Sequence, residues 1–286
     1  MVNLPIATTE CAFNIKSKNG ICSDKETINS MRKMLLNLNS NEKSLNELND
    51  KEVVEKAKKT LNCNAESCII SHPKFTNIIG ENKANKIKKY RFKPEGPWNS
   101  TEWLSNLNID NVLEQWDMLQ QEKNNDKFLH IYFQMRDFEI KKTQLATVDL
   151  ANEYKNGMRR FAVVINTDYS DDNGEHWFCI FGDFNRPDNS ITLEYFNSSG
   201  TLPLPEIHDW LHKTKKLLET NLKKNVKIIY VSRNALQKSN SECGVFCLAY
   251  IYCRLNGYDY PIFSKPGSLT DNEMYEFRKF LFRKYP

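Results

Sequence analysis

The order of apolar and polar residues divides the chain into two regions of different character. Up to about residue 95 the chain is rich in Lys, Asn and Glu and poor in aromatic residues. Within residues 41–61, leucines and valines recur at roughly helical spacing between charged residues, which predicts a solvated helical region. We therefore expect a helical arm domain over residues 1–92, followed by a linker that contains Pro and Gly at 93–98.

Apolar runs of another kind follow this linker. Runs rich in β-branched and aromatic residues predict strands at 161–168, 176–184, 191–196 and 227–231. Helical periodicity predicts helices at 108–119, 208–224 and 270–284. We expect Asp110 to cap the first of these helices, and Thr270 with Glu273 to form a capping box on the last. The pattern predicts an α+β core domain over residues 93–286, with helices flanking a central sheet that is mixed or mostly antiparallel.

Composition narrows the class of protein. The 286 residues are 40% hydrophobic, which suffices for one large domain or for a core with an accessory domain. The longest apolar run, Val245–Cys253, is too short to span a bilayer, and the N-terminus lacks the basic-then-apolar order of a signal peptide. We therefore expect a soluble intracellular protein with reduced cysteines and no membrane partner. The formal charge of +4 is too small to indicate a nucleic-acid binder by itself.

The stretch "SNSECGVFCLAYIYCRL" (239–255) places Cys243 where a polar loop is predicted to become a buried helix. We expect a thiol at the first helical turn to favour the thiolate, because the helix dipole and free backbone N–H groups stabilise negative charge. Gly244 leaves room there for a substrate. A single helical cysteine is more often a small core residue, and we interpret Cys247 and Cys253 in this way.

A nucleophilic thiol needs a base, and His176 is the informative one of the five histidines. It begins a predicted strand, and the turn sequence "NRPDN" (185–189) predicts a hairpin to the next strand. Pairing His176 with Asn197 centres this hairpin between Arg186 and Pro187, inside the turn. The hairpin therefore brings Asn197 beside His176, as in the Cys-His-Asn form of the catalytic triad, in which the amide orients the ring.

Gln237 completes the predicted constellation. It lies six residues before Cys243 in a polar loop, where its side-chain N–H and the backbone N–H of Cys243 are candidate oxyanion donors. Each residue alone has a simpler explanation, as a strand-end histidine, a turn asparagine, a loop glutamine or a core cysteine. Their combination, in this order and spacing, is far more specific than its parts.

Three blocks carry a resemblance to a known family: "GEHWFCIFGDF" (174–184), "EYFNSSG" (194–200) and "QKSNSECGVFC" (237–247). They resemble the His, acidic-or-amide, Gln and Cys blocks of the ubiquitin-like-protein protease and adenovirus endopeptidase clan. Within it, the chain most resembles polyprotein-processing cysteine proteases of the African swine fever virus type, which have an asparagine as third residue and a helical arm before the core. This resemblance extends to residues 61–73, 108–116 and 271–283.

The resemblance implies a role for each residue. It makes His176 the base, Asn197 its orienter, Cys243 the nucleophile and Gln237 the oxyanion donor. Trp177 matches a tryptophan that covers a Gly-Gly segment before the scissile bond, although a half-buried strand aromatic is the simpler interpretation. Trp103 resembles the second tryptophan of that channel in cellular members.

The implied function is cleavage after Gly-Gly in viral structural polyproteins during capsid maturation, in the host cytoplasm and the virion. The implied enzyme is a monomer that needs no cofactor. A protease of host ubiquitin-like conjugates is an alternative, because their tails also end in Gly-Gly. An acetyltransferase of the same clan, using the same residues, is a second alternative. A scaffold without catalysis is disfavoured, because all four functional positions carry competent chemistry.

Two further segments are candidate binding sites. Cys63, Cys68 and His72 form a C-x4-C-x3-H pattern that Cys11 or Cys22 could complete as a zinc site. Because no tight paired spacing supports zinc, we predict no metal and favour a buried or oxidised cysteine pair. Residues 83–93 hold six basic residues and no acidic one. They could bind nucleic acid, but a solvated surface segment is favoured.

One prediction follows from the glycines alone. The ten glycines each stand singly, so the chain contains no Gly-Gly pair. A protease restricted to Gly-Gly sites cannot cut itself, and we predict that it stays intact and active with its arm attached. Intact mass spectrometry after prolonged incubation checks this; a loss of the arm that depends on Cys243 would contradict it.

Overall fold

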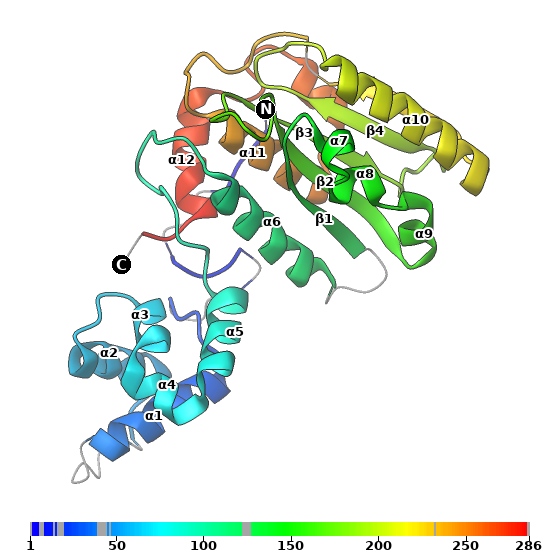
Figure 1. Cartoon of the computed structure of the whole chain (residues 1–286). Coiled ribbons are helices and arrows are strands. Elements are labelled where there is room, and N and C mark those ends of the chain that lie inside the picture. Colours follow the sequence, from blue (N-terminus) through cyan, green and yellow to red (C-terminus); the bar gives the residue numbers. More distant parts are fainter. Residues whose placement is uncertain are drawn as a thin grey trace. The chain divides into compact units, whose positions relative to one another are not determined.

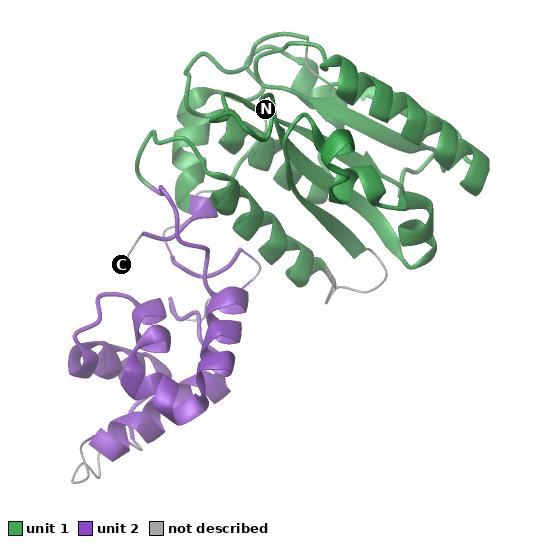
Figure 2. Cartoon of the chain, in the orientation of Figure 1, with its two compact units in different colours: residues 1–6, 99–279 green, residues 7–98, 280–286 purple. Residues whose placement is uncertain are grey.

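The computed structural model describes residues 2–5, 9–13, 15, 20–38, 45, 47–121, 127–231 and 233–284. The chain forms two compact units, coloured separately in Figure 2. Unit 1 comprises residues 1–6 and 99–279, and unit 2 comprises residues 7–98 and 280–286.

Unit 2 is helical, as predicted for the arm. Its helices are α1 (Lys25–Leu38), α2 (Asp50–Leu61), α3 (Glu66–Ser71), α4 (Pro73–Ile79) and α5 (Glu81–Arg91). The helix predicted over 41–61 begins only at Asp50, because Asn49 and Glu52 form a capping box there. Residues 41–44 and 46 of that prediction lie outside the described residues.

The segment predicted as a linker, 93–98, is packed within unit 2. Arg283 Nε donates to the backbone carbonyl of Lys93 (2.9 Å), and Arg283 also pairs with the carboxylate of Glu95. Gly96 leaves no space for a Cβ, which would lie 2.3 Å from the ring of Phe282. The sequence pattern did not predict this packing, because the segment is contacted by Phe282 and Arg283, and local periodicity does not reveal contacts between residues so far apart in the sequence.

The cysteines of unit 2 are oxidised, which corrects the expectation of reduced thiols for these residues. Cys11 pairs with Cys22, and Cys63 pairs with Cys68, with Cα separations of 5.0 and 5.6 Å that suit disulfides. Two of the three residues in the candidate zinc pattern are therefore bound to each other. The third, His72, caps α4 by accepting from the Lys74 backbone N–H through Nδ1.

The basic segment 83–93 forms most of α5, and several of its side chains are paired inside unit 2. Lys83 pairs with Glu26, and Arg91 donates to the backbone carbonyl of Cys22. Lys93 is not solvated as predicted: its side chain is buried, and burial lowers its pKa to about 8. Binding of nucleic acid by this segment, the alternative that the sequence disfavours, is not tested by these contacts.

Unit 1 is built on the mixed sheet that the sequence predicts. Its strands are β1 (Lys127–Gln134), β2 (Met158–Asn166), β3 (Trp177–Asp183), β4 (Ile191–Phe196) and β5 (Val226–Tyr230), in that spatial order. The two outer pairs are parallel, and β2, β3 and β4 run antiparallel to their neighbours in the centre. Strand β1 was not predicted; between its polar ends, Lys127 and Gln134, lie five apolar residues interrupted by His130.

Helices cover both faces of this sheet (Figure 1). On one face lie α7 (Phe138–Lys141), α8 (Gln144–Thr147), α9 (Leu150–Lys155) and α10 (Pro205–Leu222). On the other lie α6 (Asn106–Gln121) and α11 (Cys243–Leu255), followed in the chain by the short 3-10 helix η2 (Tyr260–Ser264) and by α12 (Asp271–Leu281). Helix α11 is buried almost all round, which its apolar sequence requires.

Helix α6 begins at Asn106, two residues before the predicted range and four before Asp110, the predicted N-cap. Its first turn is capped by Ser105, whose hydroxyl accepts from the backbone N–H of Asn108 (3.2 Å). Asp110 is therefore not the N-cap. Its carboxylate instead accepts from the backbone N–H of Phe133 (2.8 Å) and lies 3.1 Å from Nε2 of His130, which joins α6 to β1. The predicted capping box of Thr270 and Glu273 is present on α12.

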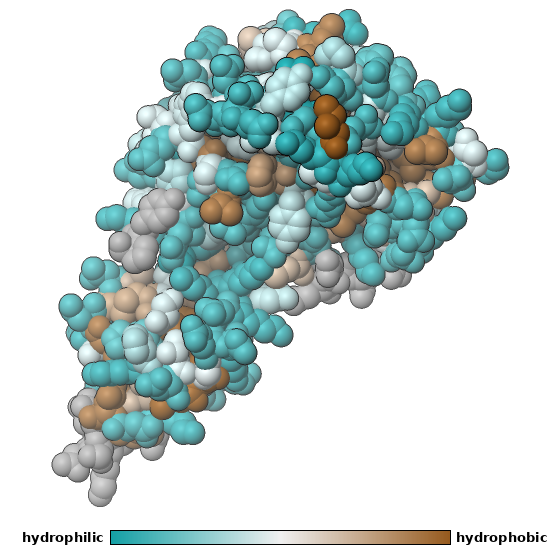
Figure 3. All heavy atoms as spheres, in the orientation of Figure 1, coloured by the Kyte–Doolittle hydropathy of each residue, from teal (hydrophilic) through white to brown (hydrophobic). Residues whose placement is uncertain are grey.

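On the face shown in Figure 3 the described residues are mainly hydrophilic, with apolar side chains scattered among them. Among the helices of the described residues, none combines the length and apolar character needed to cross a bilayer.

A buried ion cluster connects α11 to the sheet. Glu194, in the middle of β4, is fully buried and accepts from Arg254 Nε (2.8 Å) and from the hydroxyl of Tyr250 (2.6 Å). Arg254 Nη2 also donates to Asp183 on β3 (3.0 Å). A charge buried in this way is costly unless it is paired, so the cluster fixes the register of α11 on the sheet.

We predict that Arg254→Met lowers the free energy of unfolding of unit 1 by about 3–5 kcal/mol, because it removes the cation that pairs with the fully buried carboxylate of Glu194. Urea unfolding followed by tryptophan fluorescence measures this, since four of the five tryptophans lie in unit 1. The matched control is Arg186→Met, which removes a more exposed pair with Asp259 and costs about 1 kcal/mol or less. Equal losses in the two variants would contradict the role of the cluster.

Candidate active site

The residues predicted as a triad lie at the ends of elements in unit 1. His176 directly precedes β3, Asn197 directly follows β4, and Cys243 is the first residue of α11. Because β3 and β4 are antiparallel neighbours, the start of one and the end of the other lie at the same end of the hairpin. The structure therefore brings His176 and Asn197 together.

The amide of Asn197 holds the His176 ring. His176 Nε2 lies 2.7 Å from Asn197 Oδ1, which also accepts from the Ser199 backbone N–H (3.0 Å). Asn197 is buried, and its Nδ2 donates to the Tyr195 hydroxyl and to Thr201 Oγ1. Since this network fixes the amide oxygen as the acceptor, Nε2 carries the proton of the neutral ring, and Nδ1 is left as a base.

The predicted hairpin register is wrong by one residue at its centre. Cys179 pairs with Phe196, so the hairpin is centred between Pro187 and Asp188. The turn shifts because Asn189 adopts a left-handed conformation (φ 57°), with its N–H bonded to the carbonyl of Arg186. His176 and Asn197 are consequently not ladder partners, and it is their side chains, beyond the strand ends, that meet.

Cys243 is buried at the start of α11, with 3% of its surface exposed. Burial raises the pKa of its thiol to about 11, although the backbone N–H groups of Trp177 and Gly244 act in the opposite direction. The expectation that the helix start favours thiolate is therefore wrong for the ligand-free site. Within the part of the chain that the structure describes, the Cys243 thiol makes no hydrogen bond to the His176 ring. It instead contacts the backbone N–H of Trp177, the residue that follows His176.

The charge beside the nucleophile is neutralised. Glu242, which precedes Cys243, is buried and accepts from Arg278 Nε at 2.9 Å. Arg278 is itself fully buried on α12. This pair prevents an unpaired carboxylate from opposing negative charge on the neighbouring sulfur, and it fixes the first turn of α11 against α12.

Gln237 is anchored beside Asn197. Its Oε1 accepts from the hydroxyl of Ser198 (2.7 Å), and its backbone N–H donates to the carbonyl of the same residue (3.0 Å). One N–H of the side-chain amide donates to the Ser239 carbonyl (2.9 Å). The second N–H of the amide is the donor that an oxyanion would use.

Trp177 is held rigidly. Its indole Nε1 donates to the backbone carbonyl of Leu104 (3.1 Å), and its ring packs edge-on against Phe133. Gly244 lies directly beneath: a Cβ there would be 3.3 Å from Trp177 Cδ1 and 3.1 Å from Leu104 Cβ. The indole therefore lies tightly over the start of α11, next to Cys243.

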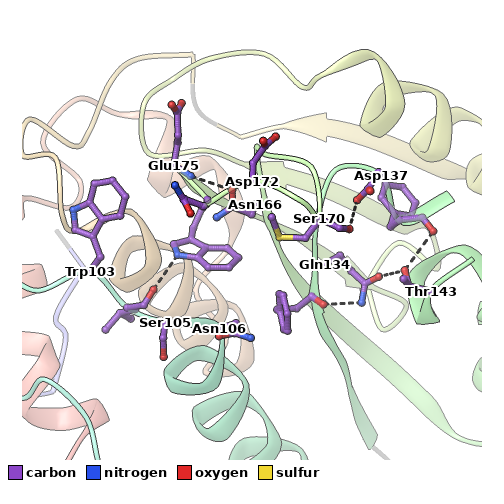
Figure 4. A pocket seen from close by; sticks show the side chains of 17 residues that line it. Trp103, Ser105, Asn106, Gln134, Asp137, Thr143, Asn166, Ser170, Asp172 and Glu175 are labelled. Carbon is purple, nitrogen blue, oxygen red and sulfur yellow. Dashed lines mark hydrogen bonds between the residues drawn. The ribbon is translucent and has the colours of Figure 1, made fainter. Parts of the chain in front are cut away.

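A cavity of about 640 Å³ opens beside this indole. Trp103, which is 52% exposed, lies at one end of it, and Asp137 and Thr143 lie at the other (Figure 4). Both predicted substrate-binding tryptophans line this one cavity, together with Leu104, Ser105, Asn106, Phe133, Gln134, Met135, Phe138, Asn166, Ser170, Asp172, Asn173, Gly174 and Glu175.

Sequence reasoning missed two residues of this site, Leu104 and Asn166. Leu104 acts through its backbone carbonyl, which leaves no trace in the side-chain pattern. Asn166 is the last residue of β2 and follows the apolar run Phe161–Ile165, and that change from apolar to polar was a signal. Its position beside the site follows only from the pairing of β2 with β3, which sets Asn166 opposite Trp177.

Known proteins resemble this chain over most of its length. A protein of African swine fever virus, described as a SUMO-1 cysteine protease, is 34% identical over 241 residues, 79% of this chain and 85% of that protein. A protein of Acanthamoeba polyphaga mimivirus, named as a candidate thiol protease, is 26% identical over 225 residues, 78% of this chain and 71% of that protein. A crystal structure of the African swine fever virus protease matches with a TM-score of 0.77 at 30% identity, covering 99% of this chain and 98% of that one. Residues 100–255 match the family model described as YopJ Serine/Threonine acetyltransferase.

The raised pKa of Cys243 predicts a distinctive alkylation profile. The rate of reaction with iodoacetamide, corrected with Cys243→Ala, should rise about tenfold per pH unit from pH 7 towards pH 11, because only the thiolate reacts. A rate that is constant between pH 5 and pH 9 would indicate a preformed thiolate–imidazolium pair and contradict this prediction.

Proposed function

The chain belongs to the family of the African swine fever virus cysteine protease, and we propose that it cleaves polyproteins after Gly-Gly through a Cys-His-Asn triad. It is a cysteine protease of that viral type. Its proposed substrates are viral structural polyproteins that are cut during capsid maturation, in the host cytoplasm and the virion. The observation that carries the proposal is the 2.7 Å contact between His176 Nε2 and Asn197 Oδ1 beside a cysteine that begins a helix.

The proposed reaction begins with a neutral pair. Burial keeps the Cys243 thiol protonated, and the uncharged amide of Asn197 stabilises an imidazolium less than a carboxylate would. Bound substrate brings the acceptor carbonyl to the sulfur. His176 Nδ1 then takes the thiol proton as Sγ attacks the carbonyl carbon of the second glycine.

Both halves of the reaction use the same groups. The oxyanion accepts from the Cys243 backbone N–H and from Gln237 Nε2. His176 gives its proton to the leaving amine, which leaves a thioester on Cys243. His176 next takes a proton from water, the resulting hydroxide attacks the thioester, and the proton returns to sulfur as the glycine acid leaves.

Selection of glycine is proposed to be steric. The Trp177 indole is fixed by Leu104 and lies close to Gly244, so it cannot move aside without breaking a buried hydrogen bond. A substrate Cβ beneath it therefore meets a rigid ring, and exclusion can exceed the ~1–3 kcal/mol of an ordinary methylene difference.

Two other reactions are each favoured by a specific observation. Residues 100–255 belong to the family described as YopJ acetyltransferase, which favours transfer of an acyl group from Cys243 to a hydroxyl acceptor instead of water. The name of the African swine fever virus relative describes a SUMO-1 cysteine protease, which favours ubiquitin-like conjugates. The three reactions share the nucleophile and differ in the acceptor or the substrate.

We predict that the purified chain cuts Gly-Gly-X peptides and rejects Gly-Ala-X and Ala-Gly-X peptides. Cys243→Ala and His176→Ala should abolish cleavage, while Asn197→Ala should retain measurable activity because the amide orients the ring without taking part in proton transfer. The matched control is Cys247→Ser, one helical turn from Cys243, which should remain active.

Parallel assays separate the candidates. Release of peptide fragments, cleavage of a ubiquitin-like conjugate, and transfer of label from acetyl-coenzyme A to protein are measured with the same enzyme preparation. Acetylation without peptide cleavage, or full activity in Cys243→Ala, would overturn the proposed function.

A further inference from the structure

The cavity beside Trp177 extends well beyond the space that two glycines need. It begins at Trp103, passes the indole and reaches Asp137 and Thr143, which belong to different elements of unit 1 (Figure 4). If the glycines lie under Trp177, as the proposed function requires, the remaining part of the cavity faces the substrate residues that precede them. This inference therefore rests on the proposed function.

A buried hydrogen-bond donor faces this cavity. Asn166 is 3% exposed, and its Oδ1 accepts from the backbone N–H groups of Asp168 (3.0 Å) and Glu175 (3.2 Å). These bonds fix the amide with Nδ2 on the other side, and none of the described residues accepts from Nδ2. Because Asn166 also lines the cavity, its Nδ2 is available to donate to an acceptor on a ligand bound there.

Gly174 keeps the space beside this donor open. It has a left-handed conformation (φ +83°), and a Cβ at this position would lie 2.9 Å from Asn166 Nδ2. Strand pairing also sets Asn166 opposite Trp177, so the donor lies beside the segment that the indole covers. A backbone carbonyl of an extended substrate is the acceptor that suits such a position.

The charged groups that line the cavity all have the same sign. Asp172 and Glu175 lie along it and are exposed, and Asp137 lies at its far end, buried and bonded to the hydroxyl of Ser170 (2.7 Å). Among the described residues that line the cavity there is no lysine, arginine or histidine. The nearby Arg136 is neutralised by Glu206 at 2.7 Å.

We infer that this cavity binds the two residues that precede Gly-Gly, with Asn166 Nδ2 donating to their backbone and the carboxylates of Asp172 and Glu175 selecting lysine or arginine side chains. The substrate class is thus a basic-Gly-Gly polypeptide. Because both carboxylates are exposed, the charge selection weakens as salt concentration rises.

Peptides that differ only before Gly-Gly test this inference. Three are compared, with two lysines, two norleucines or two glutamates in that place; norleucine keeps the lysine stem without its charge. At low ionic strength kcat/KM should fall in that order, by roughly three- to tenfold at each step, and the differences should shrink at high salt.

Variants assign the effect to residues. D172N/E175Q should bring the lysine-to-glutamate ratio towards one, whereas the control D171N, a neighbour that does not line the cavity, should keep the wild-type ratio. N166D retains both acceptor bonds and loses the donor, so kcat/KM for the norleucine peptide should fall about tenfold, mainly through KM. Thermal unfolding confirms that the variants are folded.

The outcomes distinguish this inference from the proposed function. Equal rates for the three peptides at low salt, with cleavage still dependent on Cys243, would overturn the inference and leave the function standing. If no peptide is cut, the proposed function fails. Binding of fluorescent peptides that end in Gly-Gly to Cys243→Ala, measured by anisotropy, then decides the charge preference without catalysis.

Discussion

A carboxylate buried in the middle of the sheet, Glu194, sets the constraint on which the catalytic unit depends. Its charge must be neutralised, and Arg254 does so from the last turn of α11. Asn197 lies three residues beyond Glu194, directly after the end of β4, and helix α11 begins at Cys243. One ion cluster therefore fixes the two elements that carry the proposed nucleophile and the proposed orienting amide, although neither side chain belongs to the cluster.

The surroundings of the site also determine where its protons lie. The amide of Asn197 is satisfied on both sides, so the tautomer of His176 is decided by hydrogen bonding before any substrate arrives. The protonation state of the Cys243 thiol, in contrast, is determined by burial, which raises its pKa and keeps it neutral. The site is thus preorganised in geometry before a substrate binds, and its thiol is neutral.

Local signals predicted much of this arrangement, and long-range contacts account for what they missed. Strands β2 to β5, the start of α11 and the proximity of His176 to Asn197 follow from short apolar runs and one turn, whereas β1 was missed. The same signals placed the hairpin centre one residue too early, because the left-handed Asn189 is set by the turn as a whole. They also assigned Asp110 to a helix cap, although its partners lie on β1, and they could not reveal the burial that outweighs the helix dipole at Cys243.

The cysteines of the two units require opposite redox states. Unit 2 carries two cross-links, whereas the cysteines of unit 1 are free, and one of these must remain a thiol for chemistry. A purified preparation therefore needs enough reductant to keep the Cys243 thiol reduced, but not so much that the disulfides of unit 2 are broken. Thiol exchange depends on access, and Cys11 and Cys22 are both buried while Cys68 is partly open. The reductant chosen for the buffer can thus change the disulfides of unit 2 without changing the thiol of Cys243.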